Sequence, residues 1–81
     1  MEIRFTARAR KDFTDLGPQL KAQVRKQLAL LSESLRHPSL QAKKYDEAQD
    51  VWQGRVNRSY RFYFQISGDE YVIIRIIPHP K

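Results

Sequence analysis

The 81-residue sequence contains no cysteine, which excludes disulfide bridges, thiol catalysis and cysteine-based zinc sites. No apolar run approaches the roughly 20 residues that a membrane-spanning helix needs. The longest such runs are residues 28–31 and 71–74, and Arg75 interrupts the second at once. Charged residues also break up the first ten positions, which is unlike a secretory signal. We therefore expect a cytoplasmic protein that does not enter a membrane.

The length and composition predict one globular domain over residues 1–81. A chain of 81 residues is too short for two hydrophobic cores. Apolar residues make up 41% of it and aromatic residues 11%, which is typical of folded rather than disordered chains.

Acidic residues are in the minority. Fifteen Lys and Arg residues face nine Asp and Glu residues, leaving a formal net charge of +6. Residues 45–50 contain three acids and no base, so the rest of the chain is more basic still. A positive field favours anionic partners, among which nucleic acid is the commonest. The alternative is that the charge only keeps the domain soluble.

The N-terminal half predicts a strand and two helices. Residues 2–6 alternate polar and apolar, and Thr6 is suited to cap a helix of about ten residues. Residues 16–18, Leu-Gly-Pro, mark the junction with a second helix. That helix has apolar residues at Leu20, Val24, Leu28, Leu31 and Leu35, and we expect His37-Pro38 to end it.

The C-terminal half predicts an antiparallel meander. Residues 39–50 resemble a loop, and strand-like segments follow at 51–56, 60–66 and 70–77, separated by turn residues. This order predicts an α+β fold: an N-terminal strand, a helical hairpin and a three-stranded meander, with both helices on one face of the sheet.

Strand alternation predicts which side chains face the helices. The expected inward set is Trp52, Gly54, Val56, Tyr60, Phe62, Phe64, Ile66, Val72, Ile74 and Ile76. The opposite face would then carry Arg55, Arg61, Tyr63, Tyr71 and Arg75, with His79 and Lys81 continuing the parity. Arginine binds phosphate with a bidentate fork, and tyrosine stacks on unpaired bases. An ordinary solvated sheet face is the alternative.

The two predicted helices followed by residues 51–77 resemble the RelE/ParE toxin superfamily of bacterial type II toxin–antitoxin systems. The pattern consists of a tryptophan, Arg-Val, Tyr-Arg and an aromatic-rich strand, here Trp52, Arg55, Val56, Tyr60, Arg61 and Tyr63. A Gly-Asp turn, an aliphatic strand and a basic tail with histidine follow. The resemblance covers nearly the whole chain and implies a RelE-like fold.

The resemblance implies that the chain is a toxin that inhibits translation as a ribosome-dependent mRNA interferase. In the RelE-like members of this superfamily, the ribose 2′-OH attacks the adjacent phosphorus without a metal or cofactor, leaving a 2′,3′-cyclic phosphate. Arg61 matches the arginine that stabilises the transition state, Arg55 a basic residue on the preceding strand, and His79 a C-terminal histidine. Histidine suits proton exchange near neutral pH. Two histidines without cysteine predict no metal site.

The remaining contacts to RNA are assigned to Tyr63, Arg75, Arg58, Lys81, Lys43 and Lys44. The implied partners are a cognate antitoxin, mRNA and the ribosome. Two alternatives stay open: a ParE-like toxin that binds DNA gyrase without catalysis, and an inactive relative that binds only its antitoxin. Ala42 and Lys43 stand where some members have a carboxylate base, and Gln53 stands near a lysine position of others.

Overall fold

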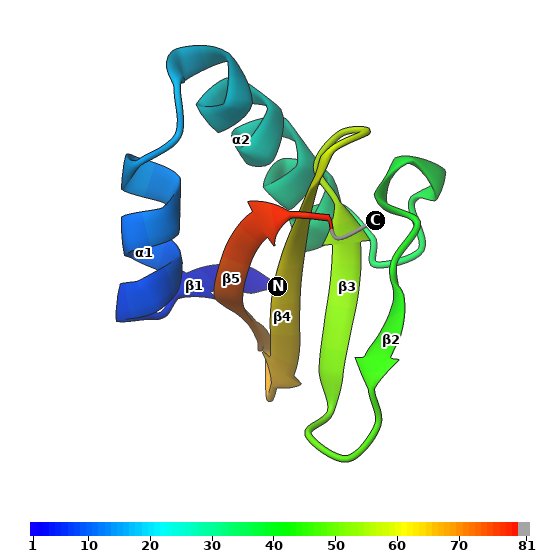
Figure 1. The fold of residues 1–81 in the computed structure, drawn as a ribbon. Helices are drawn as coiled ribbons and strands as arrows, with labels where there is room; N and C mark the ends of the chain where they lie inside the picture. The colour runs from blue at the N-terminus through cyan, green and yellow to red at the C-terminus, as the bar shows by residue number, and fades with distance from the viewer. Residues whose placement is uncertain (80–81) are drawn as a thin grey trace.

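The computed structural model describes residues 1–79 and shows a five-stranded mixed sheet with two α-helices. The elements in chain order are β1 (Glu2–Phe5), α1 (Ala7–Thr14), α2 (Pro18–Glu33), the 3-10 turn η1 (Pro38–Leu40), β2 (Lys43–Asp46), β3 (Val51–Arg55), β4 (Tyr60–Ser67) and β5 (Glu70–Pro78). The strand order is β1-β5-β4-β3-β2, in which only β1 and β5 run parallel within the described chain (Figure 1). The predicted α+β class and the meander are confirmed.

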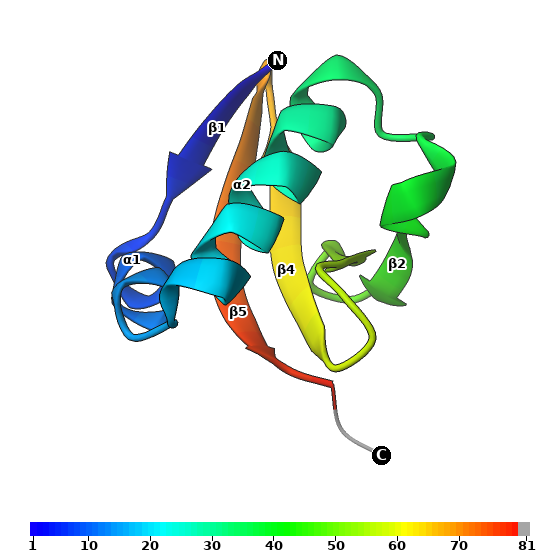
Figure 2. The same cartoon turned by 90° about the horizontal axis from the view of Figure 1, so that it is seen from above.

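The two helices occupy different places on the sheet. In Figures 1 and 2, α2 lies along one face, whereas α1 lies beside β5 beyond the end of β1. Thr6 caps α1 as predicted, because its hydroxyl accepts the amide of Ala9 at 3.1 Å. The buried residues of α2 join the core beneath the sheet: Val24, Leu28 and Leu31 pack with Phe62, Phe64 and Ile73.

The predicted end of the second helix is wrong. The helix stops at Glu33 rather than at His37-Pro38, because Ser34 adopts an extended backbone with φ −160° and ψ 117°. Leu35 nevertheless packs against the core. His37 instead caps η1, because its Nδ1 accepts the amide of Ser39 at 3.1 Å.

The segment predicted as a loop over residues 39–50 contains most of η1 and the whole of the edge strand β2. β2 pairs antiparallel with β3, placing Lys43 opposite Gln53 and Lys44 opposite Trp52. Because the strand that pairs with β2 lies outside residues 39–50, the composition of this segment does not indicate a strand.

The predicted alternation along the last strand is also wrong in its first half. Tyr63 pairs with Arg75 but Phe64 pairs with Ile73, so Ile74 is an extra residue in β5. One inserted residue reverses the facing of every residue on one side of it. Tyr71 and Ile73 therefore enter the core, whereas Val72 and Ile74 leave it and Ile76 stays buried.

Gly54 in β3 lies directly beneath the ring of Phe62 in β4. A methyl group added to Gly54 would come within 2.3 Å of Phe62 Cζ. The glycine is therefore required here by the close approach of a fully buried ring rather than by its backbone conformation. No helix within residues 1–79 has the length and apolar character needed to span a bilayer.

Candidate functional site

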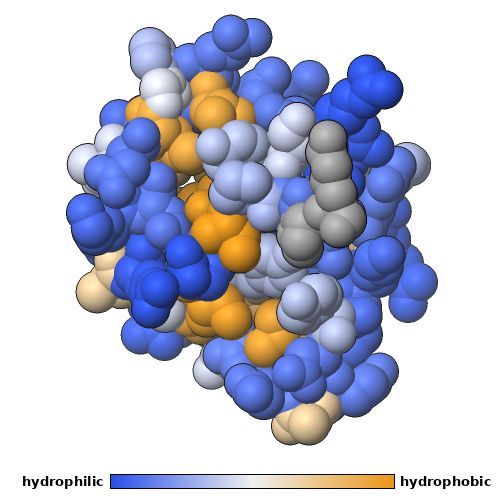
Figure 3. Space-filling model, in the orientation of Figure 1, coloured by the Kyte–Doolittle hydropathy of each residue, from blue (hydrophilic) through white to orange (hydrophobic). Residues whose placement is uncertain are grey.

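The face of the sheet opposite α2 is open and carries most of the predicted site residues. Arg55 and Arg61 lie on this face, together with Tyr63 and the outward residues of β5. Figure 3 views this side of the molecule and shows a strip of hydrophobic side chains over β5, surrounded by hydrophilic ones. The face therefore combines cationic groups with an apolar surface.

Arg55 and Arg61 are cross-strand partners in the register of β3 and β4. Directly paired like charges repel, so the arrangement does not favour the fold unless an anion binds between them. Within residues 1–79, neither arginine forms an ion pair, and the acid Asp50 of the β2–β3 turn pairs with Lys44.

The guanidinium of Arg61 is held by the β3–β4 turn. Its Nη1 donates to the backbone oxygens of Asn57 at 2.6 Å and Tyr60 at 2.9 Å. No other acceptor contacts it in the described chain, so its Nε and Nη2 donors remain free for a ligand. The two hydrogen bonds thus fix the orientation of the guanidinium.

The same turn also holds His79. The amide of His79 donates to the backbone oxygen of Ser59 at 2.7 Å. Since Pro78 pairs with Tyr60, His79 lies at the same end of the sheet as Arg55 and Arg61. His79 is exposed.

Asn57 organises this turn, and the sequence did not predict this role. Its Oδ1 accepts the amides of Ser59 and Tyr60, each at 2.8 Å. Its Nδ2 donates to Oε1 of Gln23 on α2 at 2.7 Å. Asn-Arg-Ser between two strand-like segments signals a turn, but nothing local identifies a helical residue 34 positions away as its support.

Gln27 is the second residue that sequence reasoning missed. It is one of two buried polar side chains among the described residues, with 7% exposure. Its Nε2 donates to the backbone oxygens of Ser39 at 3.1 Å and Arg55 at 2.8 Å. The helix therefore fixes the backbone of Arg55 from beneath the sheet.

Arg75 is directed away from the other arginines. Its Nε lies 2.8 Å from Oδ2 of Asp12 on α1, and the amide of Ile76 donates to the same oxygen at 3.0 Å. Burial alone would raise the pKa of Asp12, but these hydrogen bonds and the charges of Arg75 and Arg8 outweigh it and lower the pKa. Arg75 therefore ties α1 to β5.

The remaining predicted RNA-binding residues are dispersed. Lys44 pairs with Asp50 and lies 5.0 Å from the centre of the Trp52 ring, so its charge is already engaged. Lys43 is exposed on β2, and Arg58 is exposed in the β3–β4 turn. The prediction for Lys81 lies outside the described residues.

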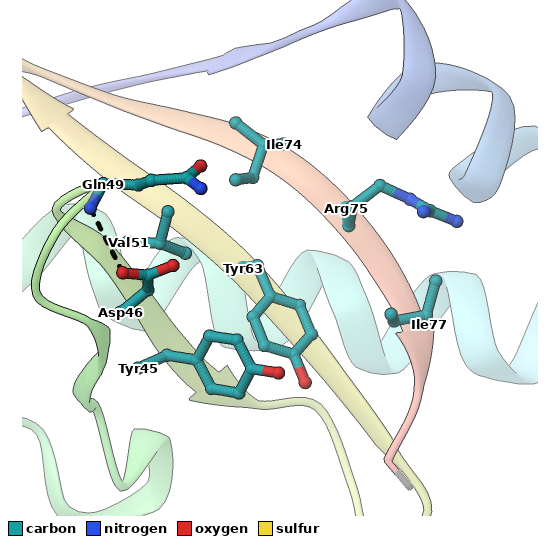
Figure 4. Close-up of a pocket in the computed structure, with 8 residues that line it drawn as sticks. All are labelled: Tyr45, Asp46, Gln49, Val51, Tyr63, Ile74, Arg75 and Ile77. Atoms are coloured by element: carbon teal, nitrogen blue, oxygen red, sulfur yellow. Dashed lines mark hydrogen bonds between the residues drawn. The ribbon is translucent and has the colours of Figure 1, made fainter.

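Beside the arginines, the open face has a hollow of about 260 Å³ (Figure 4). It is lined by Tyr45, Asp46, Gln49, Val51, Tyr63, Ile74, Arg75 and Ile77. The rings of Tyr45 and Tyr63 meet edge to face at 4.9 Å. Burial raises the pKa of the Tyr63 phenol, with Tyr45 adding to the shift and Arg61 opposing it. Tyr63 is therefore protonated at neutral pH and acts as a donor or a packing surface.

Residues 3–80 match the family described as "ParE toxin of type II toxin-antitoxin system, parDE". The fold is similar to a YoeB/ParE toxin from Agrobacterium tumefaciens, with TM-score 0.83 and 13% identity, covering 99% of this chain and 100% of that one. It is similar to the isolated E. coli RelE toxin, with TM-score 0.78 and 23% identity over 99% and 85% of the two chains.

A third similar structure is the RelBE2 toxin–antitoxin complex from Mycobacterium tuberculosis. The TM-score is 0.77 and the identity 26%, over 96% of each chain. No curated protein matches the chain in sequence. These likenesses confirm the predicted RelE-like fold.

Proposed function

The chain belongs to the ParE toxin family of type II toxin–antitoxin systems, and from that premise we propose that it is an endoribonuclease that cleaves mRNA on the ribosome. The observation that carries the proposal is the pairing of Arg55 with Arg61 on the open face, without a carboxylate partner in the described chain. Two guanidinium groups in this arrangement suit a phosphodiester.

The proposed reaction is transfer of the phosphoryl group to the neighbouring ribose oxygen. The 2′-OH attacks the adjacent phosphorus, the bond from phosphorus to the 5′-oxygen breaks, and the products are a 2′,3′-cyclic phosphate and a 5′-OH. A base removes the 2′ proton, and an acid protonates the leaving 5′-oxygen. Arg61 and Arg55 stabilise the charge that develops on the phosphate oxygens.

His79 supplies the proton transfer in this scheme, because imidazole is suited to both roles near neutral pH. Its amide is held by Ser59 in the turn that orients Arg61. Tyr63 is not the base, since burial raises its pKa and keeps the phenol protonated. The chain has no carboxylate at residues 42 and 43, so histidine is the proposed proton acceptor.

A cognate antitoxin is the proposed regulatory partner. Similar folds occur in toxin–antitoxin complexes, including the intact E. coli RelBE complex and a heterotetrameric YoeB-YefM complex from Staphylococcus aureus. The net charge of +6 favours an acidic segment of such a partner. Covering Arg55 and Arg61 would neutralise the toxin.

The proposal is tested by inducing the chain in a bacterial host and mapping the 5′ ends of cellular mRNA. We expect new ends within translated frames, reduced about 10²–10³-fold by Arg61→Ala and about 10²–10⁴-fold by His79→Ala. Arg36→Ala is the matched control, because Arg36 is exposed beside Trp52 rather than on the open face. Equal cleavage by Arg61→Ala and Arg36→Ala would overturn the assignment.

A non-enzymatic toxin that binds DNA gyrase is the second candidate, favoured by the match to the ParE family over residues 3–80. It predicts growth arrest with DNA-damage signalling and intact mRNA. An inactive relative that binds only its antitoxin predicts no growth arrest. The same induction experiment separates the three outcomes.

A further inference from the structure

We propose that the hollow between Tyr45, Tyr63 and Ile77 binds one unpaired guanine base of the RNA, selected by Asp46. This inference rests on the proposed RNA-cleaving function and assigns the base specificity of that site. Nothing in the family match addresses which base is bound, whereas the chemistry of the lining does.

The hollow has the character of a base-binding site. Val51, Tyr63, Ile74 and Ile77 form an apolar lining, and the volume of about 260 Å³ accommodates one planar base. Tyr45 stands at its rim with 59% exposure, one of two exposed large hydrophobic residues among the described positions. An exposed aromatic ring beside an apolar hollow is suited to stack a base.

The hollow is also correctly placed for a nucleotide whose phosphate meets the arginines. Tyr63 follows Arg61 by two positions on the same face of β4, which corresponds to about 6.5–7 Å along a strand. Arg75 lines the hollow only with the aliphatic part of its side chain, because its guanidinium is bound to Asp12. Figure 4 shows the guanidinium pointing away from the hollow. The cationic groups that remain to meet the phosphate are therefore those of Arg55 and Arg61.

The polar end of the hollow is acidic. Asp46 lines it beside Gln49, and its Oδ1 accepts the amide of Gln49 at 3.2 Å (Figure 4). This bond orients the carboxylate, and no cation pairs with it within residues 1–79. A carboxylate repels phosphate and accepts hydrogen bonds, so this end selects the base rather than the backbone.

Guanine is the base that matches a lone carboxylate. Its Watson–Crick edge presents two adjacent donors, N1–H and the N2 amino group, to which a carboxylate binds in bidentate fashion. Adenine offers a donor beside an acceptor, and an acceptor facing Asp46 is repelled. A good bidentate pair discriminates between bases by roughly 5- to 150-fold.

The test titrates the purified full-length chain with GMP, AMP and UMP while backbone amide signals are followed by NMR. We expect GMP to shift the amides of Tyr45, Asp46 and Tyr63, with affinity at least about tenfold above AMP. Asp46→Asn should remove the preference, and Tyr45→Ala should weaken all binding by about 5-fold or more. Glu47→Gln is the matched control, because it removes a neighbouring exposed carboxylate that does not line the hollow.

Cleavage mapping with the same variants separates the two proposals. Cuts with guanine at one fixed position, and loss of that bias in Asp46→Asn alone, would support both. Cuts without any base bias, or a bias unchanged in Asp46→Asn, would overturn the guanine site and leave the ribonuclease intact. Preferential GMP binding without cleavage would overturn the ribonuclease and retain the site. Equal binding of the three nucleotides would also overturn the guanine assignment.

Discussion

Nη1 of Arg61 donates to the backbone oxygen of Asn57 at 2.6 Å, so the orientation of the guanidinium depends on the shape of one turn. That shape depends in turn on the Asn57 side chain, which joins the turn to Gln23 on α2. The position of the helix is thereby transmitted to the proposed phosphate-binding group.

Asn57→Ala should therefore impair cleavage through the position of Arg61 rather than through a lost contact between Asn57 and RNA. Misplacement of Arg61 is expected to cost on the order of 10- to 100-fold in rate, and the lost hydrogen bonds about 1–2 kcal/mol of stability. Asn57→Asp should be milder, because it keeps the acceptor for the amides of Ser59 and Tyr60 and loses only the donor to Gln23. Single-turnover cleavage and urea unfolding measure the two effects.

Ser59→Ala is the control for Asn57, since the turn uses only the backbone of Ser59. It should behave like the wild type in both assays. A destabilised Asn57→Ala variant with a wild-type cleavage rate would show that the turn supports the fold but does not position Arg61.

Gly54→Ala should destabilise the fold, because its methyl group would approach the buried ring of Phe62 to 2.3 Å. Overpacking of this kind costs about 1–3 kcal/mol, and each kcal/mol lowers the melting temperature by roughly 4–8 °C in a domain of this size. Calorimetry measures the shift. Gly17→Ala is the control, because no described neighbour lies within 4 Å of the added carbon and its φ is −72°.

Trimming the ring tests the cause of the Gly54 effect. Phe62→Leu combined with Gly54→Ala should lose less stability than the sum of the two single changes, since the clash is absent in the pair. Strict additivity would contradict a direct contact between the two side chains.

The Asp12–Arg75 pair should make stability depend on acidic pH. The pKa of Asp12 is lowered in the folded state, so its contribution is present above about pH 4 and disappears as the pH falls through the folded pKa. Asp12→Asn should reduce the free energy of unfolding at pH 7 by about 1–3 kcal/mol. Denaturant titrations at pH 7 and below pH 4 should show the difference from wild type shrinking.

Asp15→Asn provides the comparison for Asp12. Asp15 pairs with Lys11 at an exposed position of the helix end, 3.4 Å away, and such pairs contribute less than about 1 kcal/mol. A deficit of Asp12→Asn that persisted unchanged at low pH would indicate lost packing rather than lost charge.

The salt dependence of RNA binding should identify which cations meet phosphate. Each neutralised phosphate of a single strand contributes about −0.7 to the slope of log affinity against log salt. Arg55→Gln should therefore reduce the magnitude of the slope by about 0.7. Lys26→Gln, on the solvent-exposed side of α2, should leave it unchanged. Anisotropy titrations with a short RNA measure both, and equal slopes for Arg55→Gln and wild type would remove Arg55 from the site.

Local patterns in the sequence were sufficient for both helices, apart from the end of the second, and for the strands β1, β3, β4 and β5. Thr6 is a capping residue with helical spacing behind it, and the alternation in residues 60–66 correctly predicts Phe62 and Phe64 as core. These features act within a few residues of one another, so the chain carries their signal locally. The outward placement of Arg55 and Arg61 follows from the same alternation.

Long-range pairing decided the rest. β2 exists because β3 supplies its hydrogen bonds, and the bulge at Ile74 reverses Tyr71 and Ile73 because β4 and β5 pair out of step there. Asp12, 63 positions away in the chain, holds the guanidinium of Arg75 away from Arg55 and Arg61, and Gln23 supports Asn57 across 34 positions. A hydrogen bond or bulge of this kind depends on which segments meet in space. The composition of the chain therefore determined which cationic and aromatic groups were available, and the tertiary packing decided which of them lie unpaired on the open face of the described chain.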